Sequence, residues 1–225
     1  MTEPPAVAAE IFGPGLPLAR RYAGLLVTAG LERGLLGPRE ADRIWDRHLL
    51  NCAVVAEVIP HGVRVVDAGS GAGLPGVALA IARPDLRVVL LDAQERRIAF
   101  LQECVDALDL AGAEVYRGRA EEVATRKAVG GADVVTARAL APLDRLAQWC
   151  LPLTRIGGRV LAIKGASASD EAQRHHDAIC RYGANRVTVR HCGVDRIDPP
   201  TTVVEIVRGS PVRRGGRARR GGKRQ

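Results

Sequence analysis

The spacing of apolar residues changes near residue 60 of this 225-residue chain. Before that point, apolar residues recur at helical intervals. They predict one helix in LARRYAGLLVTAGLERGLL and a second over residues 39–58. After it, short aliphatic runs alternate with helical segments. The predicted strands are VRVVDAG, LRVVLLDA, AEVYRG, ADVVTARAL and RVLAIKG. This alternation predicts an α/β fold, in which a parallel sheet carries helices on both faces.

Two further strands, RVTVRHC and TTVVEIVR, close the pattern with no helix between them. A hairpin is expected there, so one of the two should run antiparallel to the rest. We therefore predict a mostly parallel sheet of seven strands within a domain over residues 61–208. A helical extension over residues 1–60 precedes this domain, and a tail over residues 209–225 follows it.

The tail carries the charge of the protein. Its arginines and lysine, together with Arg208, supply eight positive charges and no acid, which equals the whole net charge of +8. A segment rich in arginine and glycine that has no apolar core is predicted to be disordered. Such segments commonly bind nucleic acid without sequence preference. Arg213, Arg214 and Arg217 are therefore candidate RNA-binding residues.

Composition excludes several other classes of protein. At 47% apolar residues the chain can bury a core, and no apolar run is long enough to span a membrane. The amino terminus has no signal-peptide pattern. The five cysteines are odd in number, widely spaced and without a CxxC, which indicates free thiols and a cytoplasmic protein. No histidine or cysteine spacing fits a metal site.

A glycine-rich loop, VVDAGSGAGLPG at residues 65–76, joins the first strand to the next helix. Open α/β sheets bind nucleotide-like ligands at this position. No Lys-Ser or Lys-Thr follows, so an ATP-binding P-loop is not indicated. The letters of GxGxxG fit residues 71–76, which leaves a dinucleotide open. Asp67 precedes the glycines, however, and a carboxylate repels pyrophosphate but suits the ammonium and sulfonium of S-adenosylmethionine. Asp92, at the end of the second strand, is placed to bind ribose hydroxyls of either cofactor.

Five motifs in order resemble the RsmG (GidB) family of bacterial 16S rRNA (guanine-N7) methyltransferases. They are RHLLN (47–51), the glycine loop, RAEE (119–122), TARA (136–139) and AIKG (162–165). The resemblance covers residues from about 40 to 207. It implies a class I S-adenosylmethionine-dependent methyltransferase of Rossmann-like fold. It also implies that the substrate is a guanine in the 530 loop of 16S rRNA, and that the partner is the small ribosomal subunit.

The resemblance also implies site residues. Gly69 and Leu74 match loop positions that contact the cofactor, Ala120 and Glu121 match the pair beside the adenine, and Arg138 matches an arginine near the methyl donor. The full predicted cofactor set is Asp67, Gly69, Gly71, Gly73, Leu74, Asp92, Ala120, Glu121 and Arg138.

Basic and polar residues around the expected pocket mouth match positions where the RNA is thought to enter. These candidate RNA-binding residues are Arg47, His48, Arg119 and Lys164. We expect Arg47 and His48 to lie on the exposed face of their helix, opposite its apolar stripe. Asn51 stands where many relatives have an acid.

The chemistry of this reaction requires no general base, because guanine N7 already carries a free lone pair. Orientation of the reactants can supply roughly 7–11 kcal/mol of the rate enhancement. We expect Arg138 and Lys164 to act as positioning residues that hold phosphates or the O6 edge of the guanine. Two alternatives stay open from the sequence. One is a small-molecule methyltransferase, and the other is a non-catalytic RNA chaperone that binds S-adenosylmethionine or NAD.

Overall fold

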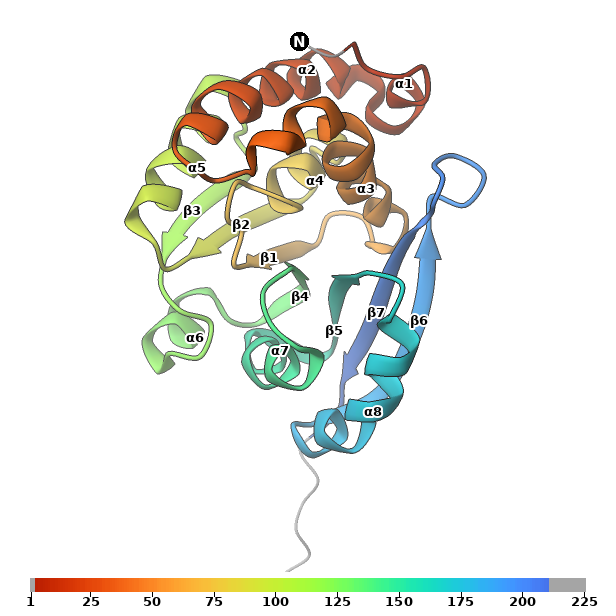
Figure 1. The fold of residues 1–225 in the computed structure, drawn as a ribbon. Helices are drawn as coiled ribbons and strands as arrows, with labels where there is room; N and C mark the ends of the chain where they lie inside the picture. The colour runs from red at the N-terminus through yellow and green to blue at the C-terminus, as the bar shows by residue number, and fades with distance from the viewer. Residues whose placement is uncertain (1–2, 211–225) are drawn as a thin grey trace, which may run out of the picture.

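A seven-stranded sheet runs through the centre of the molecule (Figure 1). The structure is a computed structural model that describes residues 3–210. In order across the sheet, the strands are β3 (Ala113–Arg117), β2 (Arg87–Asp92), β1 (Arg64–Ala68), β4 (Ala132–Arg138), β5 (Thr154–Lys164), β7 (Thr201–Arg208) and β6 (Ala184–Cys192). The predicted α/β class and seven strands are confirmed.

The chain order reverses at β1, which pairs with β2 on one side and with β4 on the other. All pairs from β3 to β5 are parallel. The last strand, β7, inserts between β5 and β6 and is antiparallel to both, so the predicted hairpin is confirmed. The segments that follow β1 and β4 therefore leave the sheet toward opposite faces. Open α/β sheets bind their ligands at such a point.

A buried acid, Glu205, links the last three strands of the sheet, β5, β7 and β6. Glu205 of β7 is 1% exposed, and its carboxylate accepts a hydrogen bond of 3.0 Å from Arg159 of β5. It also pairs with Arg190 of β6. A buried carboxylate is costly unless charged partners meet it. The two arginines satisfy it and link β5, β7 and β6 side to side.

Both faces of the sheet are buried, so the strands are apolar nearly throughout. Val65 and Leu90 point into one core cluster, while their neighbours Val66 and Leu91 point into the other. The helices α4 (Gly76–Ala82) and α5 (Glu95–Leu108) cover the first face, together with the N-terminal extension. On the second face lie α6 (Val123–Val129), α7 (Leu143–Cys150), a short 3-10 turn (Leu151–Leu153) and α8 (Ala168–Arg181).

The N-terminal extension forms two helical arms, as predicted, but neither arm is regular. The first arm comprises α1 (Val7–Phe12), a 3-10 turn (Gly13–Gly15), α2 (Leu16–Leu25) and a π-type turn (Leu26–Gly30). The second arm comprises a 3-10 turn (Pro38–Arg43), a π-type segment (Ile44–Leu50), α3 (Asn51–Ala53) and a 3-10 turn (Val54–Val58). The π-type geometry is frequent at functional sites, and in the second arm it buries three consecutive side chains, those of residues 48–50.

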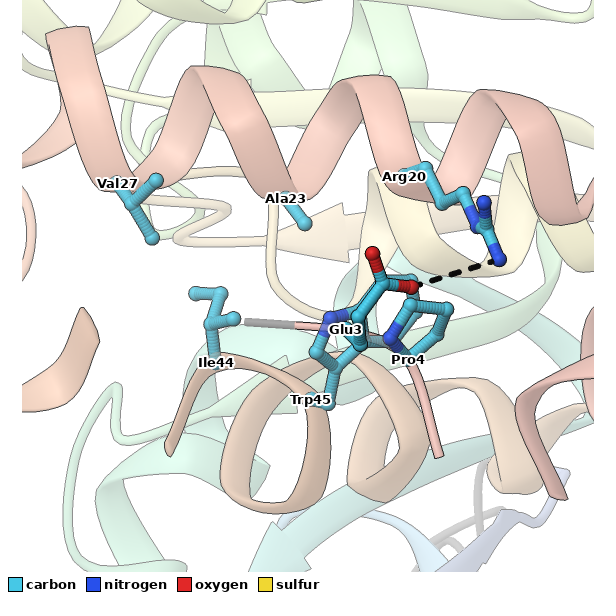
Figure 2. A pocket seen from close by; sticks show the side chains of 7 residues that line it. All are labelled: Glu3, Pro4, Arg20, Ala23, Val27, Ile44 and Trp45. Carbon is cyan, nitrogen blue, oxygen red and sulfur yellow. Dashed lines mark ion pairs between the residues drawn. The ribbon is translucent and has the colours of Figure 1, made fainter. Parts of the chain in front are cut away.

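The two arms pack against each other around a small pocket of about 70 Å³ (Figure 2). Ala23 and Val27 of the first arm face Ile44 and Trp45 of the second. An exposed ion pair of 3.8 Å between Arg20 and Glu3 lies at its edge. None of the predicted site residues within the described range 3–210 lines this pocket, so it belongs to the packing of the extension.

The extension is fixed to the glycine loop by Tyr22. This side chain is fully buried, and its hydroxyl donates a 2.8 Å hydrogen bond to the carbonyl oxygen of Ala72. Gly73 has φ +94°, and a Cβ there would lie 2.7 Å from the Tyr22 hydroxyl and 2.5 Å from Val77. Glycine is therefore required for the loop to pass under the tyrosine.

All five cysteines are free, and four are buried, with Cys180 partly exposed, as predicted for unpaired thiols. Among residues 3–210, no helix has the length and apolar character needed to cross a bilayer.

We predict that Tyr22→Phe lowers the free energy of unfolding by about 1 kcal/mol, because the buried carbonyl of Ala72 loses its donor. Urea unfolding followed by circular dichroism measures this difference. Tyr182→Phe is the matched control, since Tyr182 is 43% exposed and its hydroxyl can bond water. Equal stabilities of the two variants would contradict the role of the Tyr22 hydroxyl.

Candidate functional site

A pocket of about 200 Å³ opens beyond the carboxyl ends of β1, β2, β3 and β4. It is lined by Gly69, Leu91, Asp92, Ala93, Gln94, Arg97, Gly118, Arg119, Ala120, Glu121, Leu140 and Trp149. The glycine loop, the end of β2 and the RAEE motif thus meet, although 50 residues separate the first from the last. Five of the predicted site residues, Gly69, Asp92, Arg119, Ala120 and Glu121, line it together.

Asp92 places a carboxylate in the wall of this pocket. It is 3% exposed and accepts hydrogen bonds from the backbone amides of Gly71 (3.0 Å) and Gln94 (2.9 Å). Arg97 pairs with it at 3.3 Å. The amides hold the carboxylate in place, and of its roughly four acceptor positions these three donors leave about one open. Its chemistry therefore fits a ligand that presents hydroxyl donors, such as a ribose.

Asp67 does not face this pocket. Its side chain is fully buried, because alternation along β1 directs it to the face beneath the first turn of α4. The carboxylate accepts hydrogen bonds from the hydroxyls of Ser70 (2.8 Å) and Thr136 (2.8 Å) and from the amide of Gly76 (2.9 Å). Burial raises its pKa to about 6, against the opposing effect of these three bonds. This geometry differs from our expectation, in which the Asp67 carboxylate contacts a cationic ligand directly.

Two glycines allow the close approach on which this arrangement depends. A Cβ on Gly76 would lie 2.3 Å from Leu90 and 2.7 Å from the Asp67 carboxylate, so only glycine brings its amide so near the acid. Gly69 has φ +71°, and a Cβ there would lie 2.6 Å from Leu140. The segment after β4 therefore closes over the glycine loop.

Arg138, at the end of β4, is held by the N-terminal extension. Its guanidinium donates to Nδ1 of His48 (3.0 Å), to the carbonyl oxygen of Arg47 (3.2 Å) and to Sγ of Cys52 (3.1 Å). The structure thus brings together Arg138 and the RHLLN motif across some 90 residues of sequence. His48 itself is 6% exposed, so the expectation that it lies on an exposed helix face was wrong.

Lys164 holds the segment that follows β4 from the side of α8. Its ammonium donates to the carbonyl oxygen of Ala141 (3.0 Å) and to Glu171 of α8 (3.0 Å). The same Glu171 oxygen accepts the amide of Leu143, the first residue of α7, at 2.7 Å. The side chain of Lys164 is 14% exposed. These bonds tether the segment between β4 and α7, which contains Leu140 of the pocket.

Other predicted residues lie further from the pocket. Arg47 is half-exposed, pairs with Glu40 at 3.5 Å and lines a separate cleft of about 460 Å³ beside the β6–β7 loop. The walls of this cleft also include Arg43, Asn51 and Arg196. Leu74 is 8% exposed and, like Gly73, is absent from the lining of the 200 Å³ pocket. Residues 213, 214 and 217 lie outside the described part of the chain.

Sequence reasoning missed seven lining residues of the pocket: Leu91, Ala93, Gln94, Arg97, Gly118, Leu140 and Trp149. Leu91, Ala93, Gln94 and Gly118 lie within two residues of a strand end, Arg97 lies in the first turn of α5, and Leu140 follows Arg138 by two residues. Their positions relative to strand ends could therefore have indicated them. Trp149 projects from α7, and no local pattern distinguishes it from a core residue.

Comparison with known proteins gives consistent matches. The family model of rRNA small subunit methyltransferase G, GidB, matches residues 16–197. A ribosomal RNA small subunit methyltransferase G from Salinispora tropica is 59% identical over 216 residues, which cover 92% of this chain and 88% of the relative. One of the same name from Mycobacterium marinum is 54% identical over 226 residues, which cover 99% of each chain.

Two solved structures share the fold. Aeropyrum pernix fibrillarin, in complex with natively bound S-adenosyl-L-methionine, has a TM-score of 0.54 and 21% identity over 72% of this chain and 75% of its own. The S-adenosylmethionine-dependent methyltransferase SibL has a TM-score of 0.56 and 19% identity over 72% of this chain and 55% of its own. With its sheet, its glycine loop and these matches taken together, the chain belongs to the rRNA small subunit methyltransferase G (GidB) family.

Proposed function

We propose that this protein transfers a methyl group from S-adenosylmethionine to N7 of a guanine in the 530 loop of 16S rRNA. The observation that carries the proposal is the Asp92 carboxylate in a pocket lined by residues 118–121, at the point where the strand order reverses. Relatives named as small-subunit rRNA methyltransferases support the RNA substrate.

The chemical demand on the protein is orientation. Bound S-adenosylmethionine would supply an electrophilic methyl group, and guanine N7 offers a lone pair without prior loss of a proton. The protein therefore has to hold the two reactants in line, and fixed geometry is worth roughly 7–11 kcal/mol. Asp92 and the segment 118–121 would hold the cofactor, while Arg138 would orient the guanine through its phosphate or O6 edge.

Asp67 would act on the cofactor through the loop. It ties β1 to Ser70, to the start of α4 and to Thr136 of β4. The backbone amides of the loop are positioned by these bonds, so their loss would change the shape of the pocket wall that contains Gly69.

The RNA would meet the protein over two regions. The cleft whose walls hold three arginines and two acids lies beside the segment that holds Arg138. Its arginines, Arg43, Arg47 and Arg196, would therefore contact phosphates near the target guanine. The basic tail follows Arg208, the last residue of β7. Because β7 is antiparallel to β5, Arg208 lies at the end of the sheet opposite the pocket. The tail would contact RNA phosphates without sequence preference.

Deletion of the gene should remove the N7-methylguanosine from the 530 loop, because we propose that this protein transfers that methyl group. Mass spectrometry of nuclease fragments of 16S rRNA measures it. The wild-type gene should restore the methyl group, and a gene carrying Asp92→Ala should not. Persistence of the modification in the deletion strain would overturn the proposed substrate.

Asp67→Asn and Asp67→Ala separate a bonding role from a charge role. An asparagine can accept from Gly76 and Ser70 and donate to Thr136, so we expect S-adenosylmethionine affinity within about tenfold of wild type. Alanine loses three bonds of about 1 kcal/mol each, so affinity should fall on the order of 100-fold. Isothermal titration measures both, and equal losses in the two variants would show that the charge is required.

Removal of residues 209–225 should weaken RNA binding without changing kcat at saturating RNA. If the tail pairs with about four phosphates, its loss should make the slope of log K against log[salt] shallower by roughly 3.6. Filter binding of a 530-loop RNA between 50 and 200 mM salt measures this slope. An unchanged slope would mean that the tail does not contact the RNA.

A further inference from the structure

Three side chains form a continuous path from the N-terminal extension to the end of β4. Glu40 lies in the 3-10 turn of the second arm, His48 in the π-type segment, and Arg138 at the last position of β4. The Glu40 carboxylate lies 2.7 Å from Nε2 of His48, and Nδ1 of His48 lies 3.0 Å from the Arg138 guanidinium. The histidine is the middle member, and its side chain is 7% exposed.

Only one protonation state of His48 satisfies both contacts. A guanidinium has donors and no acceptor, so Nδ1 must be unprotonated to receive Arg138. The single ring proton then resides on Nε2 and is donated to Glu40. The histidine is therefore neutral, with its tautomer fixed from both sides.

We propose that Glu40 and His48 are positioning residues that hold Arg138 in the orientation required for methyl transfer, and that protonation of His48 releases it. This inference rests on the function proposed above, in which Arg138 orients the guanine. It makes the N-terminal extension a part of the site, since three acceptors of Arg138 come from residues 47–52.

The surroundings of His48 favour the neutral state. Burial is the first cause that lowers its pKa below the usual 6.5, and the positive charge of Arg138 is the second. The hydrogen bond and charge of Glu40 act in the opposite direction, and Arg47 lowers the pKa further. The bond to Arg138 is thus present above the pKa of His48 and is lost as pH falls through it, because a proton on Nδ1 would face a donor.

The release would change an orientation and leave the fold in place. Arg138 keeps two other acceptors, the carbonyl oxygen of Arg47 and Sγ of Cys52. These lie on the same segment, so the guanidinium can turn about them while β4 stays paired with β1 and β5. Substrate turnover should therefore respond more strongly than protein stability.

The test uses the full-length protein with small ribosomal subunits that lack the methyl group, between pH 5 and 8. We compare His48→Gln, His48→Ala and Glu40→Gln with wild type, and His61→Ala is the control because His61 is highly exposed and pairs with Asp85 rather than with Arg138. The readouts are kcat, KM for S-adenosylmethionine and, on the protein without cofactor, the ring nitrogen signals of His48 by NMR.

In wild type, the acidic limb of kcat should share its midpoint with the NMR titration of His48, and the NMR signals should show the proton on Nε2. His48→Ala should lower kcat by up to about 100-fold with little change in KM for S-adenosylmethionine, and should lose the limb. His48→Gln should recover part of kcat and also lack the limb, because an amide can accept and donate but does not titrate there.

Glu40→Gln separates this role from a merely structural one. Glu40 raises the pKa of His48, so its neutralisation should move the limb and the NMR midpoint together to lower pH. A wild-type midpoint in Glu40→Gln, or an acidic limb that persists in His48→Gln, would overturn the inference even if His48→Ala failed to fold. If wild type itself produced no N7-methylguanosine, the proposed function would fail instead.

Discussion

The buried carboxylate of Asp67 is the contact on which the arrangement of the site depends. From the face of β1 it accepts hydrogen bonds from the glycine loop, from the first residue of α4 and from β4. An ionised carboxylate in an apolar core is unfavourable unless donors surround it. Three donors from three different segments meet that need, so the acid specifies where each segment lies relative to the others. The pocket at the end of the sheet follows from that specification.

The N-terminal extension completes the site from outside the sheet. Tyr22 fixes the glycine loop through Ala72, while the segment around His48 supplies the acceptors for Arg138. On the opposite side, Lys164 and Glu171 fix the segment that follows β4. Arg138 and Leu140 are thus held from two directions by elements that are far away in sequence. Pre-organisation of this kind is what a reaction limited by orientation requires.

The sheet could be predicted from sequence because strands buried on both faces appear as continuous apolar runs between helical segments. Asp92 could be predicted because a strand end in this fold meets the ligand. The surroundings of His48 could not, since residues 44–50 form a π-type segment, whose side chains do not follow the spacing of a regular α-helix. The same holds for Glu205, an acid in an apolar strand, whose arginine partners become neighbours only after β7 inserts between β5 and β6. Contacts that join distant segments have no local signal.

The insertion of β7 has a consequence for how the chain can vary. Because β7 is antiparallel to its neighbours, the last described residues leave the sheet at the end opposite the 200 Å³ pocket. In the N-terminal extension, by contrast, Tyr22 contacts the glycine loop and His48 contacts Arg138. The N-terminal extension is therefore under closer constraint from the site than the end of β7 is.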